Sequence, residues 1–249
     1  MGIGEAVTKE FVRHGAQVVM LSRDQGRLDA ARERIGHSEQ TLALTCDVRH
    51  REEIDRVIAL SMHHFRRIDV WINNAGRGLL DSAAAVKMVD VRETFETNLF
   101  GAMEAMQAVL PIMRQNKSGA IINISSVAGH IPIPFHGVYS ATKFAMNALG
   151  KAARIELAGT GVNVLTVCPG YVQTEFAANA LRGAEAKRVR PKSARGITAD
   201  RVARAVLKGY LKGKREVIVP WTMIPVVKLY QLLPGVVERV MVKMAQGAS

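Results

Sequence analysis

Short apolar runs alternate with amphipathic, helix-like segments along most of the chain. The strand-like runs cover residues 16–21, 41–46, 68–72, 120–124, 162–167 and 216–219. Helical patterns lie between them at 5–14, 24–35, 50–65, about 82–115, 138–157 and 199–211. Parallel strands that are covered on both faces read as continuous apolar runs. The alternation therefore predicts an α/β fold, a doubly wound parallel sheet with helices on both faces, in a single domain over residues 1–220.

Composition is that of a soluble globular protein. Of the 249 residues, 48% are hydrophobic and 22% are charged, which is ordinary for such a protein. The two cysteines, Cys46 and Cys168, each stand in an apolar strand-like run. We expect both to be buried and reduced rather than joined in a disulfide, as suits a reducing compartment. No secretory signal is recognised, so the expected location is the cytoplasm.

The chain is strongly basic, with a formal net charge of +12 and a pI near 10.1. Part of the charge is concentrated at Arg182, Lys187, Arg188, Arg190, Lys192 and Arg195. A solvated loop is the favoured interpretation. The alternative is attraction to an anion, namely a phosphorylated cofactor, an acidic lipid or an acidic substrate. Nucleic acid is not an expected partner, because no nucleic-acid motif accompanies the charge and aromatic residues make up only 5%.

Tyr139 and Lys143 are four residues apart in a helical pattern and so lie on one side of the helix. A phenol has a reference pKa of about 10 and is a poor proton donor or base near neutral pH. A fixed ammonium nearby lowers that pKa toward the working range. The pair alone is weak evidence, but Ser126 follows the apolar run 120–124 and precedes Tyr139 by thirteen positions (139 − 126 = 13).

Other polar and glycine positions follow predicted strands or open helices. Gly2 and Gly4 open the first helix, where a phosphate can approach backbone N–H groups. Ser22-Arg23 ends the next strand. At this position an acidic residue would bind a ribose 2′-hydroxyl, whereas an arginine accommodates a 2′-phosphate. The pair therefore favours NADP(H), and NAD(H) stays open as the alternative.

Three further positions have two interpretations each. Asp47 follows a strand at the ligand-binding edge of the sheet, but it could equally cap the next helix. The run 73–76 (Asn-Asn-Ala-Gly) suits a tight turn or contacts with an adenosine. Asn98 lies inside a helical pattern, as a buried structural amide or as a local kink that holds a polar relay. The seven histidines show no metal-ligand spacing, and no metal is expected.

In this order and spacing, the residues resemble the short-chain dehydrogenase/reductase family. The resemblance rests on Gly2-Ile3-Gly4, Asp47, the run 73–76, Asn98, Ser126, Tyr139, Lys143 and Pro169-Gly170, and it extends to about residue 220. It implies a Rossmann-type fold, a nicotinamide cofactor, a small carbonyl or alcohol substrate, and a homodimer or homotetramer. The cofactor-binding positions that it implies, together with Ser22 and Arg23, are Gly2, Ile3, Gly4, Asp47, Val48, Asn74, Ala75, Gly76, Tyr139, Lys143, Pro169, Gly170, Val172 and Thr174.

The resemblance also implies a role for each catalytic position. Tyr139 would be the acid in carbonyl reduction and the base in alcohol oxidation. Lys143 would bind the nicotinamide ribose and lower the Tyr139 pKa, and Ser126 would orient the substrate oxygen. Asn98 would hold a water in a proton relay to Lys143. Thr174 would bond the nicotinamide carboxamide, and residues 175–197 would form a substrate loop.

The chain departs from the family pattern at its start. Family members begin with a strand and then T-G-x-x-x-G-I-G, whereas here Met1 directly precedes the last two glycines. We expect the sequence to be a fragment or to carry a misassigned start, rather than to be a true short form that binds cofactor poorly. Without that strand, neighbouring strand edges would be exposed.

Residues 221–249 form an apolar tail broken by Pro225 and by Pro234-Gly235. Its last part carries a helical apolar stripe of Val236, Val237, Val240, Met241 and Met244. We expect the tail to pack on the domain or across a dimer. The alternative is an amphipathic anchor for peripheral membrane contact.

These observations predict an NADP(H)-dependent oxidoreductase that interconverts a carbonyl and an alcohol. The apolar tail hints at a hydrophobic ketone, aldehyde, lipid or steroid-like substrate. The competing hypothesis is a non-catalytic dinucleotide-binding or scaffold protein, inactive because the first strand is lost.

Overall fold

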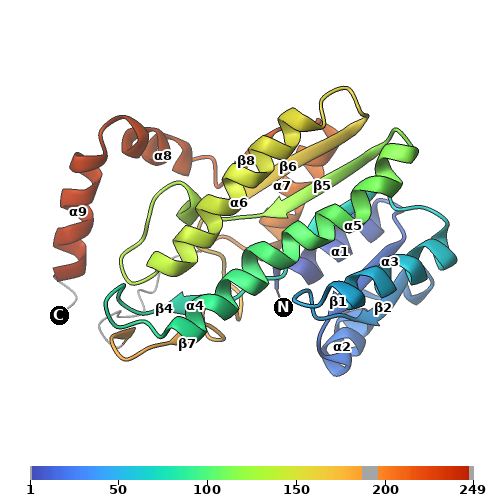
Figure 1. Ribbon diagram of the computed structural model, residues 1–249, viewed down its shortest axis with the longest axis horizontal. Coiled ribbons are helices and arrows are strands. Elements are labelled where there is room, and N and C mark those ends of the chain that lie inside the picture. The colour runs from blue at the N-terminus through green and yellow to red at the C-terminus, as the bar shows by residue number, and fades with distance from the viewer. Residues whose placement is uncertain (1, 187–195, 247–249) are drawn as a thin grey trace.

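The computed structural model describes residues 2–186 and 196–246. At its centre lies a parallel sheet in two parts (Figure 1). One part pairs β1 (Val18–Ser22) with β2 (Thr41–Thr45). The other has the order β3 (Val70–Asn73), β5 (Gly119–Ile124), β6 (Val162–Pro169) and β8 (Glu216–Val219). Every one of these neighbouring pairs is parallel, as the apolar runs predict.

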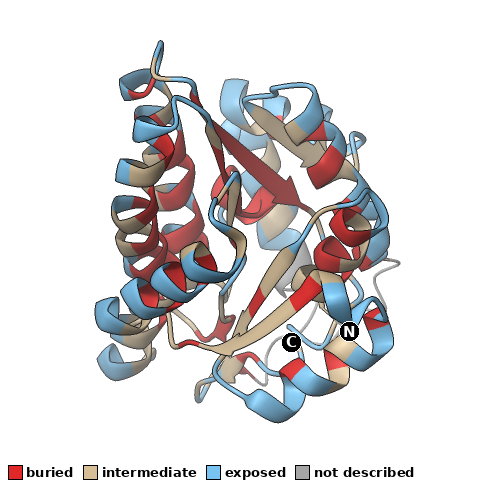
Figure 2. Cartoon of the chain, turned by 90° about the vertical axis from the view of Figure 1, so that its right-hand side faces the viewer, coloured by how far each residue is buried: buried red, intermediate tan, exposed pale blue. Residues whose placement is uncertain are grey.

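Helices cover both faces of the larger part of the sheet, with their buried residues turned inward (Figure 2). Alternate residues of a strand point to opposite faces, so Ile122 packs against α1 (Ile3–Arg13) and α7 (Ala199–Leu211). Its neighbour Ile121 belongs to the opposite core, with the other set of helices. These helices are α3 (Arg51–Phe65), α5 (Gly101–Gln115) and α6 (Gly137–Glu156). The prediction of a doubly wound α/β fold is confirmed.

The sheet is interrupted between β1 and β3. Within residues 2–186 and 196–246 no strand pairs with both of them, so the sheet is found in two parts, each with an unpaired edge, as the missing first strand predicts. Val18 and Ile72, one from each edge strand, both pack against the core under α1 and α7. A cavity of about 2300 Å³ is lined by both edge strands and continues to the candidate site.

Local sequence explains where several helices begin and end. Gly15 adopts a φ of +84° directly after α1, a left-handed conformation that favours glycine. Asp24 caps α2 (Gln25–Ile35) by accepting a hydrogen bond from the backbone N–H of Arg27 at 3.0 Å. Thr198 caps α7 in the same way, accepting from Arg201 N at 3.3 Å. The short 3-10 helix η1 (Ser38–Gln40) leads into β2.

The predicted helix over 82–115 begins later, at Met88, and then continues without a break to Gln115. The chain turns over residues 83–85 and then forms α4 (Met88–Phe95), a single π-helical segment η2 (Glu96–Phe100) and α5. Just before it, the two-residue strand β4 (Leu79–Leu80) pairs with β7 (Leu181–Arg182). Strands of two residues give no readable pattern in the sequence, which is why this pair was not predicted.

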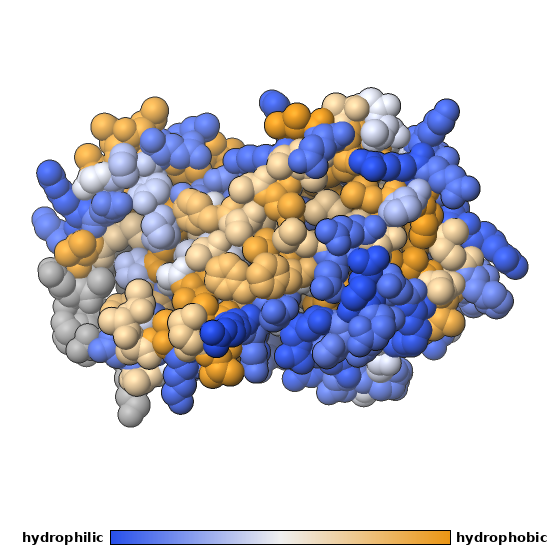
Figure 3. Space-filling model, viewed as in Figure 1, coloured by the Kyte–Doolittle hydropathy of each residue, from blue (hydrophilic) through white to orange (hydrophobic). Residues whose placement is uncertain are grey.

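The apolar tail forms two helices, α8 (Met223–Leu232) and α9 (Pro234–Gln246), at the end of the molecule away from β1 and β2 (Figure 1). Val227 of α8 is buried against Val127 and Ile131. Other apolar side chains of the tail stay exposed, among them Trp221, Leu229, Leu232, Leu233, Val236 and Val240. On the face shown in Figure 3, apolar residues cover much of the middle and are mixed with hydrophilic ones over the tail, whereas hydrophilic residues dominate around α2. Among the described residues, no helix combines the length and the apolar character needed to cross a bilayer.

Candidate functional site

One cavity brings together nearly all the residues singled out in the sequence. They come from the carboxyl ends of β1, β2, β3, β5 and β6 and from the adjoining helices, where open α/β sheets bind ligands. The cavity-lining residues among them are Gly2, Ile3, Gly4, Ser22, Arg23, Asp47, Val48, Asn74, Ala75, Gly76, Ser126, Tyr139, Lys143, Pro169, Gly170, Val172 and Thr174. Asn98 does not line the cavity. It lies fully buried behind the 73–76 turn.

Tyr139 and Lys143 lie one turn apart on α6, facing the end of β5. The Lys143 side chain is only 3% exposed, and its Nζ donates a hydrogen bond to the Ile124 carbonyl at 2.9 Å. The same Nζ lies 5.8 Å from the centroid of the Tyr139 ring. Phe176, from the segment after β6, packs against the other side of Tyr139 with ring centroids 5.6 Å apart. The ammonium and the phenol are therefore neighbours without a direct hydrogen bond.

Burial controls the protonation of this pair. It raises the pKa of Tyr139 to about 12, although a hydrogen bond with Ser126 acts in the opposite direction. It also lowers the pKa of Lys143 to about 8. Loss of water around the phenol is thus the main cause of the Tyr139 shift, and the lowering of this pKa by Lys143, which the resemblance implies, stays a prediction. Tyr139 keeps its proton throughout the neutral range.

Ser126 stands directly after β5 and begins a 3-10 turn, η3 (Val127–Gly129). Its Oγ accepts a hydrogen bond from Ala128 N at 3.0 Å and donates one to the Pro169 carbonyl at 3.4 Å. These bonds fix the hydroxyl beside Tyr139. The sequence predicted the position of Ser126 after a strand and ahead of Tyr139, but not these two bonds.

Asn98 occupies the π-helical segment η2, where its amide is fully buried. Its Oδ1 accepts from the backbone N–H of Arg77 at 2.7 Å, and its Nδ2 donates to the Arg77 carbonyl at 3.0 Å and to Thr142 Oγ1 at 3.1 Å. The side chain therefore ties the 73–78 turn to α6. Single π turns inside helices are frequent at functional sites.

Close packing of backbone defines the cavity wall near the helix starts. A Cβ on Gly4 would lie 2.7 Å from Asn74 Nδ2, and one on Gly101 would lie 2.5 Å from the Val48 carbonyl. A Cβ on Gly76 would lie 3.4 Å from Asn98 Oδ1 and 3.8 Å from Lys143 Nζ. No side chain caps the first turn of α1, which leaves its backbone N–H groups available to an anion.

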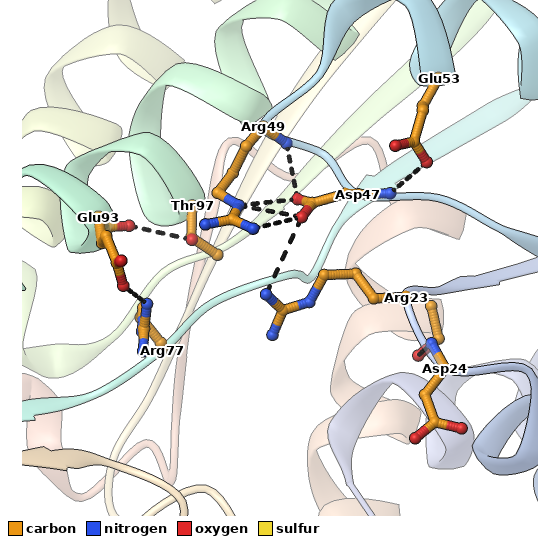
Figure 4. A network of polar contacts seen from close by, with 9 residues as sticks. Arg23, Asp24, Asp47, Arg49, Glu53, Arg77, Glu93 and Thr97 are labelled. Atoms are coloured by element: carbon orange, nitrogen blue, oxygen red, sulfur yellow. Dashed lines mark hydrogen bonds and ion pairs between the residues drawn. The ribbon is translucent and has the colours of Figure 1, made fainter.

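An arginine cluster surrounds Asp47 at the end of β2 (Figure 4). Arg49 binds both carboxylate oxygens, with Nη2 2.6 Å from Oδ2, and chiefly this hydrogen bonding lowers the pKa of Asp47. Arg23 reaches the same carboxylate only at 4.0 Å, and its side chain is 64% exposed. Asp47 therefore does not cap α3; the residue before that helix is His50. Nothing in the spacing pointed to Arg49, because its role depends on the fold of the 47–49 turn.

The remaining predicted positions follow β6. The Gly170 N–H donates to the Val219 carbonyl at 2.8 Å, Val172 forms a bridge with Ile197, and Thr174 Oγ1 accepts from Phe176 N at 3.3 Å. Within the predicted substrate loop, β7 is held at the cavity rim by β4. Residues 187–195 of that loop, and with them most of the basic cluster, lie outside the described residues.

A family model described as short chain dehydrogenase matches residues 1–185. The chain belongs to the short-chain dehydrogenase/reductase family. This is an oxidoreductase family, and the match covers the cavity walls and the Tyr139/Lys143 helix.

Known members of the family resemble most of the chain. A ketoacyl reductase of Nostoc sp. is 35% identical over 220 residues, which are 88% of this chain and 75% of the relative. A short-chain dehydrogenase structure from Streptomyces avermitilis has a TM-score of 0.83 and 26% identity and covers 100% of this chain and 95% of its own. The closed form of a serine dehydrogenase complexed with NADP+ has a TM-score of 0.78 and 29% identity, over 88% and 90% of the two chains.

Proposed function

We propose that this short-chain dehydrogenase/reductase is an NADP(H)-dependent enzyme that interconverts a carbonyl and an alcohol. The observation that carries the proposal is the meeting of Ser126, Tyr139 and Lys143 on one wall of the cavity. The opposite end of the same cavity holds the uncapped start of α1 and the arginine cluster. A proton donor and an anion-binding region thus share a single cleft.

The residues fit a nicotinamide dinucleotide. The free N–H groups of the first α1 turn suit the pyrophosphate, and Lys143 Nζ is placed to bind ribose hydroxyls beside Tyr139. Asp47, Val48 and the 73–76 turn border the part of the cavity that would hold the adenosine, and the segment from Pro169 to Thr174 borders the nicotinamide end. When bound, the reduced cofactor supplies the hydride.

The protein's own contribution is proton transfer and orientation. With its pKa raised to about 12, Tyr139 is protonated at neutral pH and donates its proton to the carbonyl oxygen. The Ser126 hydroxyl, fixed by its bonds to Ala128 and Pro169, orients that oxygen. Asn98 holds the 73–78 turn in place and, as the family resemblance implies, a relay water as well. Burial of Lys143 keeps solvent from the ammonium.

The arginine at the end of β1 favours NADP(H). Since Arg49 neutralises Asp47, the largely exposed Arg23 can turn to a 2′-phosphate, for which a charge-assisted contact contributes about 1.5–3 kcal/mol. We expect Arg23→Ala to weaken NADPH binding by roughly 10- to 100-fold and to leave NADH binding unchanged. Fluorescence titration of both nucleotides checks this, with Arg13→Ala of α1 as a control of equal charge. Equal losses for NADPH and NADH would contradict the assignment of Arg23.

The substrate end of the cavity is apolar. Phe176, Met223 and Met241 line it, the last two from the C-terminal helices. This favours a hydrophobic ketone or aldehyde, and the ketoacyl reductase among the relatives acts, by its name, on a carbonyl compound. NADPH consumption with short and long aliphatic ketones would test the preference, which requires that activity rise with chain length.

A non-catalytic dinucleotide-binding protein is the second candidate, and the interrupted sheet is the observation that favours it. The gap between β1 and β3 adjoins the start of α1, so the pyrophosphate region has fewer walls than a continuous sheet would give. If the first proposal holds, the chain as it stands binds NADPH in the micromolar range. Titration before and after fusing an apolar strand ahead of Gly2 separates the cases. Turnover in the fused form would favour the first candidate, and NADPH binding without turnover in both forms would favour the second.

The exposed apolar side chains of α8 and α9 support an oligomer, a homodimer or homotetramer, in which these helices contact another subunit. Residues 221–249 are accordingly proposed as a tail distinct from the domain of residues 1–220. Peripheral membrane contact by the same surface is the alternative. Light scattering of the chain in low salt without detergent reports the oligomer. A membrane-bound form would instead be lost from the soluble fraction.

A further inference from the structure

Three side chains of metal-binding type meet behind the catalytic wall. His130 follows η3, Cys168 lies near the end of β6, and Glu216 begins β8. One ligand atom from each of these residues lies within 4.8 Å of the other two. His130 and Cys168 are buried, with exposures of 7% and 0%. Spacing along the chain could not reveal this group, because its members are 38 and 48 positions apart (168 − 130 and 216 − 168) and come together only in the folded sheet.

The topology explains why the three groups converge. In the β6–β8 pairing, Thr166 is opposite Glu216 and Cys168 is opposite Ile218. Residues two apart on a strand point to the same face, so Cys168 and Glu216 lie on one face of the sheet. Asn147 of α6 lies next to that face, with its Oδ1 3.8 Å from the Cys168 sulfur. His130 completes the group from the turn after η3.

Two of the three distances in the group are close to the edges of a tetrahedral zinc site. His130 Nε2 lies 3.5 Å from Cys168 Sγ and 3.1 Å from Glu216 Oε1. Zinc bonds of about 2.3 Å to sulfur and about 2.0–2.2 Å to nitrogen and oxygen, at tetrahedral angles, separate those atom pairs by about 3.5 Å and about 3.4 Å. Cys168 Sγ and Glu216 Oε1 lie within 4.8 Å of each other, and a tetrahedral zinc ion would bring them to about 3.6 Å.

The carboxylate of Glu216 is already held next to His130. Its Oε1 is a buried atom, although the side chain as a whole is 31% exposed, and it forms an ion pair with His130 Nε2 at 3.1 Å. A cation held between Oε1, Nε2 and Sγ would take the place of this ion pair, and a thiolate and a carboxylate together balance a charge of +2.

We propose that His130, Cys168 and Glu216 form a binding site for a divalent metal ion of the zinc type. Asn147 Oδ1 is placed as the fourth, neutral ligand. Binding releases the thiol proton of Cys168 to solvent and forms the sulfur–metal bond, with no change of oxidation state. The ion would join η3, β6 and β8 directly behind Ser126 and Pro169, so its role is to hold that wall rather than to take part in the reaction.

Cobalt(II) titration of the full chain after treatment with a chelator tests the proposal. A tetrahedral site with a cysteine ligand gives a thiolate-to-cobalt charge-transfer band, which zinc then removes by competition. The chain has only two cysteines, so Cys168→Ser is expected to abolish the band and Cys46→Ser to retain it. His130→Gln and Glu216→Gln are expected to lose the tetrahedral spectrum.

Thermal unfolding provides a second, independent readout. Zinc is expected to raise the melting temperature of the wild type and of Cys46→Ser, and to leave that of Glu216→Gln unchanged. A folded wild-type chain that gives no thiolate band would overturn the proposal, and so would a band that persists in Cys168→Ser. Equal melting temperatures of the wild type with chelator and with zinc would likewise overturn the proposal and leave the group as a buried ion pair.

Discussion

Replacing Tyr139 with phenylalanine is expected to abolish carbonyl reduction while leaving coenzyme binding intact. The substitution removes one hydroxyl from a partly buried ring that stays packed against Phe176. General acid catalysis contributes roughly 10²- to 10⁴-fold, and no other phenol lies beside Ser126 among the residues that the structure describes. The measurement is steady-state NADPH consumption together with fluorescence titration of NADPH.

A matched control for this variant is Tyr230→Phe. That hydroxyl joins α8 to α9 by donating a hydrogen bond to Glu238 at 3.2 Å, and it does not line the cavity. Its loss should leave turnover close to that of the wild type. If Tyr139→Phe kept full turnover, the role of Tyr139 as acid and base would have to be given up, whatever the fate of NADPH binding.

Replacing Lys143 with methionine is expected to inactivate the enzyme and at the same time to stabilise the fold. Burial lowers the pKa of the ammonium from 10.5 to about 8, so at neutral pH the folded chain holds a charge in an unfavourable place. A shift of this size corresponds to about 3 kcal/mol, at about 1.4 kcal/mol per pKa unit. Loss of the hydrogen bond to the Ile124 carbonyl destabilises the variant by about 1 kcal/mol, which offsets part of this gain. We expect a net gain on the order of 1–2 kcal/mol at pH 7.

The pH dependence of unfolding separates this cause from simple packing. Because the folded pKa lies below the unfolded one, the unfolded chain holds more protons between pH 8 and pH 10.5, and wild-type stability rises with pH in that window. Lys143→Met should lose this rise, so the two curves converge toward pH 10. Urea unfolding from pH 7 to pH 10 measures it, with the exposed Lys208→Met as control. A variant less stable than the wild type at pH 7 would contradict this explanation.

Much of the fold can be predicted from the sequence because burial on both faces leaves a clear pattern. Apolar runs such as 120–124 and 162–167 lie within the strands that form the centre of the sheet. The two-residue pair β4–β7 and the π turn at Asn98 are set by long-range contacts, among them the hydrogen bonds from Asn98 to Arg77. Such contacts leave no local periodicity, which is why the helix predicted over 82–115 begins too early and does not distinguish the π segment.

The candidate site, like the fold, could be predicted from the sequence only in part. The spacing of Ser126, Tyr139 and Lys143 predicted one proton-transfer wall, and the structure places these residues together. Spacing could not predict the direction of the Tyr139 pKa shift, which depends on how much water the surrounding chain excludes. Nor could it find Arg49, since the arginine meets Asp47 only through the turn between them.

The interruption of the sheet divides the molecule into two parts that need not unfold together. α2, β1 and β2 have a small core of their own around Met20, Leu28 and Ile35, and no strand hydrogen bonds join them to β3. Amide protons of β1 and β2 should therefore exchange through a local opening of lower free energy than those of β5 and β6. The arginine cluster stands on the first part and Tyr139 on the second, so a dinucleotide lying across both would act as a brace, and its binding would slow exchange in β1 and β2 far from the reacting carbon.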